Sequence, residues 1–227
     1  MKLELPISEL KNMVVKQIAN FFFCISEEEV LIKETVDDAL NASEYCFSHS
    51  NTSYYQKDGE VYFSPFHSGQ YAIFLYFLSN IFFKKHPNFR TVADRIYYLN
   101  KALNSVELFY EVELPAIFFA DHPIGSVMGR AKYGNFFSYA QNCSVGNNKG
   151  IYPIIGENVR MAAGSTIFGN CNIGDNVIIS AHTYVKDTNI SACCIVFGTS
   201  PNLVIKHKEE AYFKSEIVYY KGYKNWN

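Results

Sequence analysis

The sequence predicts an α+β protein in which an N-terminal helical unit is followed by a parallel β-helix. Helical periodicity occupies the first hundred residues, and a six-residue repeat occupies most of the remainder. A change of periodicity of this kind indicates two structural units. We therefore expect a helical domain over residues 1–108, a β-helix over 109–206 and a C-terminal tail over 207–227.

The six-residue repeat is clearest between residues 155 and 186. An aliphatic or methionine residue returns at every sixth position, and small or apolar residues lie four positions later. The first series is Ile155, Met161, Ile167, Ile173, Ile179 and Val185, and the second is Val159, Ser165, Cys171, Val177 and Thr183. A period of six fits neither a helix nor an alternating strand. It fits stacked coils of three short strands around a prism. Known hexapeptide β-helices wind left-handed, against the usual crossover rule, and we expect that hand here.

The repeat also extends in both directions from this stretch. An earlier run has its large residues at Val127, Tyr133, Tyr139 and Val145, and its second series at Ala131, Phe137 and Cys143. Four extra residues separate Val145 from Ile155 and lie in the segment GNNKGIYP, which predicts a loop between two coils. Beyond Val185, Ser191 is a poor inward residue, and we expect Phe197 and Leu203 to keep the register.

The N-terminal part contains four predicted helices and one short strand. The helices are expected over 8–24, from Ser26 to about Ser43, over 66–85 and from a cap at Thr91, and the strand over 60–63. Ser26 and Glu29 have the spacing of a capping box, and His86-Pro87 ends the third helix. The tail is expected to contain a short helix near 207–216, and Tyr219 to Tyr223 remain unassigned.

Composition limits the kinds of partner that the protein can have. The chain has 227 residues and a formal net charge of −2, so no global field attracts nucleic acid or an acidic membrane. Its longest apolar run, Tyr71 to Phe83, is too short to span a bilayer. None of the six cysteines forms a CxxC pair, which favours buried thiols over a metal site. We expect a soluble cytoplasmic protein.

The strongest candidate for chemistry is His122, which follows Asp121 just before the first coil. A histidine beside an acid can act as a general base near neutral pH. The stretch Asp121 to Gly129, the hexads, the segment QNCSVG at 141–146, the Gly-rich loop and Pro153 to Gly156 together resemble serine acetyltransferases and their sugar-acetylating relatives.

The resemblance implies an acetyl-CoA-dependent acetyltransferase that uses no metal and assembles as a homotrimer, with each active site shared between subunits. His122 would be the catalytic base, and Asp121 and Tyr152 would contact the acceptor. The carboxylate that orients the base would be Glu113, with Glu111 as the alternative. Acetyl-CoA would lie along Gly146, Ala163 and Ala181, with Lys206 near its phosphates. For each Gly and Ala, a purely structural role as a small corner residue of the prism is an equally good interpretation.

Several alternatives remain open. Serine acetyltransferases have a histidine before the proline that follows the loop, whereas this chain has Tyr152-Pro153. The change favours a sugar or nucleotide-sugar of surface polysaccharide synthesis as acceptor, and serine is the alternative. A zinc lyase such as a γ-type carbonic anhydrase needs three converging histidines, and only His182 joins His122 within the coils. A non-catalytic scaffold would bind no CoA.

Overall fold

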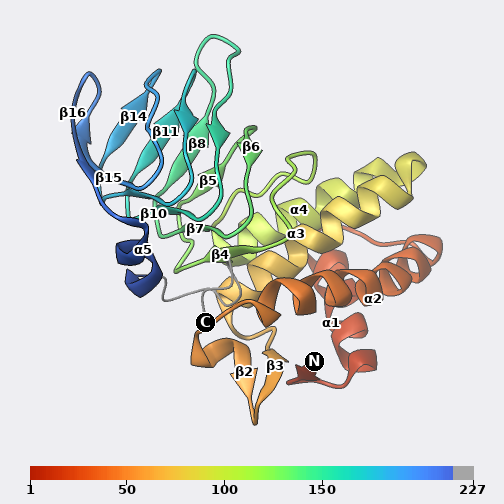
Figure 1. The fold of residues 1–227 in the computed structure, drawn as a ribbon. Helices are drawn as coiled ribbons and strands as arrows, with labels where there is room; N and C mark the ends of the chain where they lie inside the picture. Colours follow the sequence, from red (N-terminus) through yellow and green to blue (C-terminus); the bar gives the residue numbers. More distant parts are fainter. Residues whose placement is uncertain (217–227) are drawn as a thin grey trace.

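The computed structural model describes residues 1–216, and Figure 1 shows helices at one end and a column of stacked strands at the other. The helical unit consists of α1 (Ile7–Phe21), α2 (Ser26–Ser48), α3 (Ser68–Lys85) and α4 (Arg90–Asn104), with short 3-10 turns at Ser53–Tyr55 and Pro87–Phe89. A small sheet of β1 (Lys2–Leu3), β3 (Glu60–Phe63) and β2 (Gln56–Lys57) lies beside the helices.

Helix α3 forms the centre of the helical unit because it is apolar around its whole circumference. Almost every side chain from Gly69 to Phe82 is buried, including the polar residues Gln70, Ser79 and Asn80. A helix of this kind has to be covered on all sides. It packs against α2 and α4, and it also contacts β4 (Phe118–Ala120), the first strand of the coils. Helix α3 therefore joins the two units.

A buried ion pair joins α4 to the start of α2. The guanidinium of Arg95 on α4 donates to both carboxylate oxygens of Glu28 on α2, at 2.5 and 3.1 Å, and to the Phe23 carbonyl. It also lies 4.1 Å from the centre of the Phe23 ring. The hydrogen bond from Arg95 lowers the pKa of Glu28, although burial opposes this effect. Arg95 thus fixes the connection between α1 and α2 against α4.

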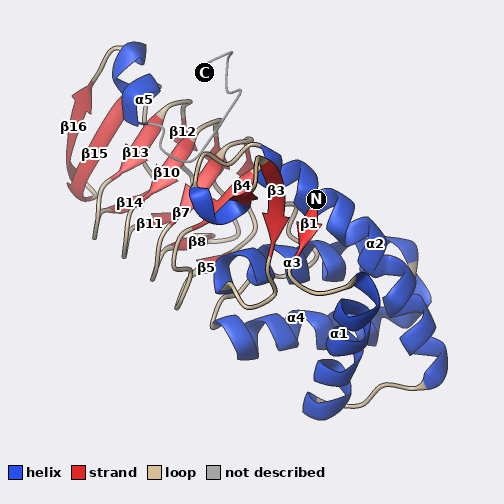
Figure 2. Cartoon of the chain, turned by 90° about the horizontal axis from the view of Figure 1, so that it is seen from below, coloured by secondary structure: helices blue, strands red, loops and turns tan. Residues whose placement is uncertain are grey.

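The coils have three faces, each made of parallel strands. Figure 2 shows the strands extending away from the helices. The first face contains β4, β7 (Phe137–Tyr139), β10 (Val159–Met161), β13 (Val177–Ile179) and β15 (Cys194–Thr199). The second contains β5 (Val127–Met128), β8 (Ser144–Gly146), β11 (Thr166–Phe168) and β14 (Tyr184–Lys186), and the third contains β6 (Lys132–Tyr133), β9 (Ile154–Ile155) and β12 (Asn172–Ile173). The winding is that of a left-handed β-helix.

The hexad pattern correctly predicts the interior of the later coils. Every residue of the two series between Ile155 and Val185 is at most 2% exposed. Register pairs such as Met161 with Ile179 and Ile167 with Val185 stack like residues in successive coils. The predicted fold class, helices followed by a parallel β-helix, is confirmed.

The register prediction is wrong at both ends of the prism. Val127 faces outward and its neighbour Met128 is buried, because the inward Met128 lies five positions before the inward Tyr133, whereas the equivalent residues Ile167 and Ile173 are six apart. At the far end Ile190 occupies the inward position, one residue before Ser191. Phe197 is consequently exposed, and Leu203 lies on β16 (Asn202–His207), which pairs antiparallel with β15. Hexad spacing alone cannot reveal turns that gain or lose a residue.

Two predicted helix starts are displaced. Helix α4 begins at Arg90 without a side-chain cap, so Thr91 is not the cap. At α2 the Glu28 carboxylate accepts from the Ile25 backbone N–H at 3.1 Å, which moves the capping arrangement one residue before the predicted Ser26–Glu29 pair. The predicted tail helix is present as α5 (Glu210–Glu216), and Tyr219 to Tyr223 lie outside the described residues. Within the described chain, no helix combines the length and apolarity needed to cross a membrane.

We predict that Arg95→Met lowers the free energy of unfolding by roughly 3–5 kcal/mol, because the buried Glu28 carboxylate would lose its partner. Urea unfolding at pH 7 measures the change. The loss should shrink as the pH falls from 7 to below the lowered pKa of wild-type Glu28. In Arg95→Met the hydrogen bond that lowers this pKa is absent and burial raises it, so protonation removes the uncompensated charge of the variant first, and the wild type loses its own Glu28 stabilisation at lower pH. Lys84→Met is the matched control. It breaks the exposed Lys84–Glu113 pair and should cost less than about 1 kcal/mol. Equal losses in the two variants would contradict the prediction.

Candidate active site

The Asp121–His122 turn directly follows β4 and projects from the first coil. The Asp121 backbone N–H donates to the Tyr139 carbonyl at 2.9 Å, and that of Ile124 donates to the His122 carbonyl at 2.7 Å. These bonds place His122 in the left-handed conformation, with φ of 48°, and leave its side chain 86% exposed. Its Nε2 lies 3.7 Å from Asp121 Oδ1. The imidazole is therefore accessible and has a carboxylate beside it.

His122 has a positive φ in addition to the left-handed residue that each corner of the prism contains. The corner residues of successive coils are Gly125, Asn142, Gly164 and His182, with φ values of 74°, 57°, 71° and 57°, and each of the last three donates its N–H to the carbonyl just before the corner residue of the preceding coil. Gly and Asn adopt this conformation at little cost. The stacked corners form one edge of the molecule, and His122 lies in the longer turn that leads to the first corner residue, Gly125, at the end nearest the helices.

A second histidine, His67, approaches this turn from the helical unit. It caps α3, and its Nδ1 accepts from the Gln70 N–H at 3.3 Å, so the neutral ring has its proton on Nε2. A Cβ added to Gly69 would lie 2.9 Å from the Ala120 carbonyl oxygen, which shows how closely α3 meets the end of β4. Burial, and secondarily the charge of His122, lowers the pKa of His67. His67 is therefore a neutral donor near physiological pH.

Tyr55 lies behind His67 and is also part of this junction. Its ring is 5.9 Å from that of His67 and 5.3 Å from that of Phe119. The hydroxyl is fully buried, and no hydrogen-bond partner for it is found in the described structure. Burial raises the pKa of Tyr55, and Asp121 contributes to the same shift. Asp121 and Arg160 together line a small cleft. The junction thus combines two histidines, a carboxylate and a buried phenol.

The structure does not bring Glu113 to His122. The Glu113 carboxylate accepts from Lys84 Nζ at 2.7 Å in the last turn of α3, whereas His122 lies near the first turn. Helix α3 has 18 residues, so at about 1.5 Å per residue its two ends are roughly 25 Å apart. The prediction that Glu113 orients His122 is not supported, because the connection after α4 carries Glu113 to the wrong end of this helix.

Glu107 is the upstream acidic residue whose backbone the fold pairs with the end of the His122 turn. Its N–H donates to the Ser126 carbonyl at 2.9 Å, and its carbonyl accepts from the Met128 N–H at 3.1 Å. These bonds align Glu107 with Val127, at the end of the His122 turn. Its side chain pairs with Lys101 at 2.5 Å. The sequence offered no signal for this pairing, because the strand-like segment around Glu107 precedes the first full hexad.

Tyr152 lies at a different corner of the same chain. It is half-exposed in the loop between β8 and β9, where Arg130, Lys132 and Ile151 line a shallow cavity with it. The turn that carries His122 joins the first face to the second, whereas this loop joins the second to the third. A single chain therefore does not place Tyr152 beside His122.

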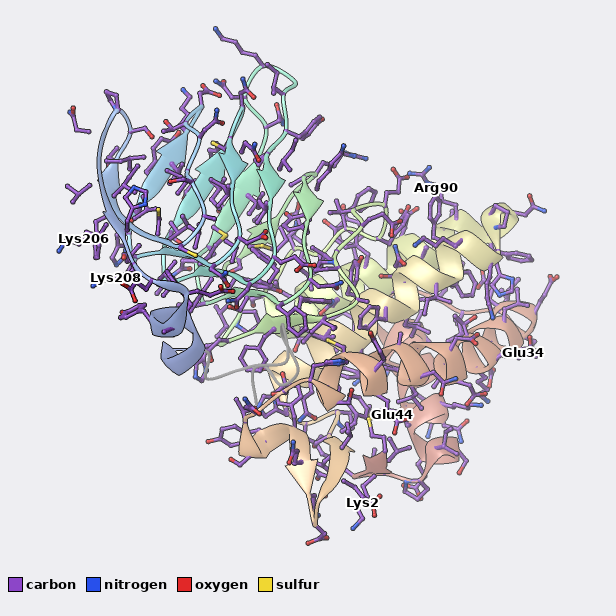
Figure 3. The ribbon with its side chains drawn as sticks, viewed as in Figure 1. Lys2, Glu34, Glu44, Arg90, Lys206 and Lys208 are labelled. Atoms are coloured by element: carbon purple, nitrogen blue, oxygen red, sulfur yellow. The ribbon has the colours of Figure 1, made fainter. Side chains whose placement is uncertain are left out.

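The residues predicted to contact acetyl-CoA are distributed over two edges. Ala163 and Ala181 follow the stacked residues Met161 and Ile179 along the His122 edge. Gly146 ends β8, and a Cβ there would lie 2.5 Å from the Phe168 ring, so packing alone explains this glycine. Lys206 lies on β16 with Nζ 5.3 Å from the Phe197 ring centre, and Figure 3 shows it pointing outward. Within residues 1–216 no cluster of three or more His, Cys, Asp or Glu side chains could hold a metal ion.

Comparison with solved structures identifies the architecture. The chain superposes on the Neisseria gonorrhoeae serine acetyltransferase with a TM-score of 0.71 at 18% identity, over 93% of this chain and 84% of that one. A serine acetyltransferase solved in complex with CoA gives a TM-score of 0.65 at 16% identity, over 88% of this chain and 84% of that one. The chain has the serine acetyltransferase fold.

Sequence relatives agree with this result. The serine acetyltransferase of Staphylococcus epidermidis is 29% identical over 147 residues, which cover 57% of this chain and 62% of the relative. That of Synechococcus elongatus is 31% identical over 104 residues, covering 44% and 43%. The matches thus span less than two thirds of these curated relatives. No known family profile matches the chain. The resemblance to serine acetyltransferase-like enzymes is confirmed.

We predict that Gly69→Ala destabilises the protein by about 1–3 kcal/mol, because the new methyl group would overlap the Ala120 backbone oxygen. Helix propensity alone would give the opposite sign, since alanine is favoured over glycine by about 1 kcal/mol inside a helix. Thermal unfolding measures the change. Ser68→Ala, at the exposed neighbouring position, is the control and should have little effect. A stabilised Gly69→Ala variant would show that α3 and β4 are not in tight contact.

Proposed function

We propose that this protein transfers an acetyl group from acetyl-CoA to an acceptor hydroxyl, with His122 as the general base. The observation that carries the proposal is the exposed imidazole of His122, paired with Asp121 at the first corner of a serine acetyltransferase fold. The sequence relatives with the printed name serine acetyltransferase support the same chemistry.

The reaction would be a direct transfer. His122 accepts the proton of the acceptor hydroxyl as its oxygen attacks the thioester carbonyl, a C–O bond forms and the C–S bond breaks. The proton then passes from His122 to the CoA thiolate. A positioned general base is worth roughly 10²–10⁴-fold in rate. Glu107 is the residue we propose for orienting the ring, because its backbone lies along the end of the His122 turn.

Acetyl-CoA would lie along the edge that holds Ala163 and Ala181, on the coils that follow His122. These small side chains leave the backbone of successive corners accessible. The serine acetyltransferase solved with CoA supports this choice of co-substrate. Gly146 and Tyr152 lie at the next edge, so a groove between two copies would bring a Tyr152 to a His122. We therefore propose a homotrimer whose active sites are shared between subunits.

Two acceptors have support. Serine is the acceptor favoured by the comparisons, since the relatives and the solved structures are serine acetyltransferases. A sugar is favoured by Tyr152, a neutral phenol on a larger apolar ring at the position where serine acetyltransferases have a histidine. A phenol suits a polyol that stacks on the ring, whereas a histidine can meet the carboxylate of an amino acid.

We predict that His122→Asn lowers the rate of CoA release from acetyl-CoA by at least about 10²-fold, because asparagine cannot accept the proton. Asparagine tolerates the left-handed backbone, so the turn should keep its shape. His182→Asn is the matched control, because His182 is also exposed and has φ of 57°. It should retain full activity. An active His122→Asn enzyme with an unchanged pH profile would rule out the proposed base.

We predict that Tyr152→His shifts acceptor preference toward serine. The ratio of kcat/KM for serine to that for a hexose should rise about tenfold, since an imidazolium can pair with the serine carboxylate. Ile151→His, at the neighbouring exposed position, is the control and should leave the ratio unchanged. An unchanged ratio in Tyr152→His would remove Tyr152 from the acceptor site.

A further inference from the structure

A cavity in the helical unit opens next to the candidate site. It has a volume of about 420 Å³, and its wall includes Tyr54, Lys57, Tyr62, Phe66 and His67. Small-molecule sites commonly have volumes of about 300–1,000 Å³. His67 is the part of the wall nearest the Asp121–His122 turn, because the first turn of α3 packs on Ala120. His67 therefore joins the cavity to the end of β4, which directly precedes the Asp121–His122 turn, within one chain.

Gln70 holds the two sides of this cavity together. Its side chain is fully buried, and its Oε1 accepts from the Ser64 N–H at 2.6 Å, while its Nε2 donates to the Tyr54 carbonyl at 2.7 Å. Both bonds are to backbone, so the segment before β2 and the segment after β3 are fixed against α3. The cavity is a pre-formed part of the fold rather than a gap between loose loops.

The wall combines aromatic rings with one positive charge. Tyr54 and Phe66 are 68% and 71% exposed, which is unusual for large aromatic side chains. Lys57 lies with Nζ 5.0 Å from the centre of the Tyr62 ring. Lys57 has no ion-pair partner within residues 1–216, although its neighbour Asp58 pairs with Lys2. Aromatic faces pack against the apolar C–H face of a pyranose ring, and a lysine ammonium binds phosphate or carboxylate as a point charge.

We propose that this cavity is an acceptor subsite for a hexose that carries a phosphate or a carboxylate. The ring would stack on Tyr54 and Phe66, and the anionic group would meet Lys57. A hydroxyl at the opposite side of the ring would lie at His67, whose Nε2–H is available as a donor, within reach of the His122 turn. This inference rests on the proposed acetyl transfer and specifies its acceptor. Serine has too few atoms to fill such a cavity.

Binding to the full-length protein without acetyl-CoA tests the subsite separately from catalysis. Titration calorimetry with glucose 1-phosphate, glucuronate, glucose and serine should show binding of one or both anionic hexoses and weaker binding of glucose and serine. The two anionic probes distinguish a sugar phosphate from a uronic acid. Lys57→Gln should raise the Kd for the anionic probe about tenfold, as expected for losing one charge-assisted hydrogen bond. Tyr54→Ala should weaken the anionic and neutral hexoses alike.

Matched controls are available on other surfaces of the helical unit. Lys16→Gln removes an exposed lysine of α1, and Tyr98→Ala removes a half-exposed tyrosine of α4; neither should change the Kd. Equal affinities in Lys57→Gln, Tyr54→Ala and the controls would overturn the subsite, even if the enzyme acetylates another acceptor. Binding that needs Lys57 and Tyr54, without acetyl transfer to any probe, would support the subsite and overturn the proposed function.

Discussion

The close contact between the first turn of α3 and the end of β4 determines where chemistry can occur in this protein. Helix α3 is buried on all sides, so its position is fixed by the helical core. Gly69 lets it approach the Ala120 backbone, and the next two residues are Asp121 and His122. The helical unit therefore supplies a wall of the site as well as a cap for the open end of the prism. This contact brings His67 toward the His122 turn, and Tyr55 packs behind His67.

The prism imposes a second constraint, because its corners repeat. Each coil turns through a left-handed residue at the same edge, and the longer turn of the first coil adds His122 as a second left-handed residue before Gly125. Among the coils within residues 1–216, only the one next to the helices combines an exposed imidazole with an adjacent carboxylate and a second histidine. The architecture offers many equivalent corners, and the neighbouring unit makes one of them chemically different.

The position of Tyr152 has a related consequence. It occupies the corner between the second and third faces, whereas His122 occupies the corner between the first and second. A straight, regular prism keeps these two edges apart along its whole length. An acceptor site that uses both residues therefore requires two chains, whereas the cavity beside His67 requires only one. The Tyr152 part of the proposed acceptor site thus depends on the assembly of two chains, and the cavity beside His67 does not.

The sequence by itself determined the helical unit, the prism and its interior, because a six-residue period buries one large residue per strand whatever surrounds it. It also singled out Asp121 and His122, since they are adjacent in the chain. The register at Val127 and Phe197 depended on turns of irregular length, which spacing does not reveal. The separation of Glu113 from His122, and the approach of His67 and Glu107, were decided by packing between segments distant in sequence. Tertiary structure alone fixes such contacts, because they depend on where α3 meets the first coil.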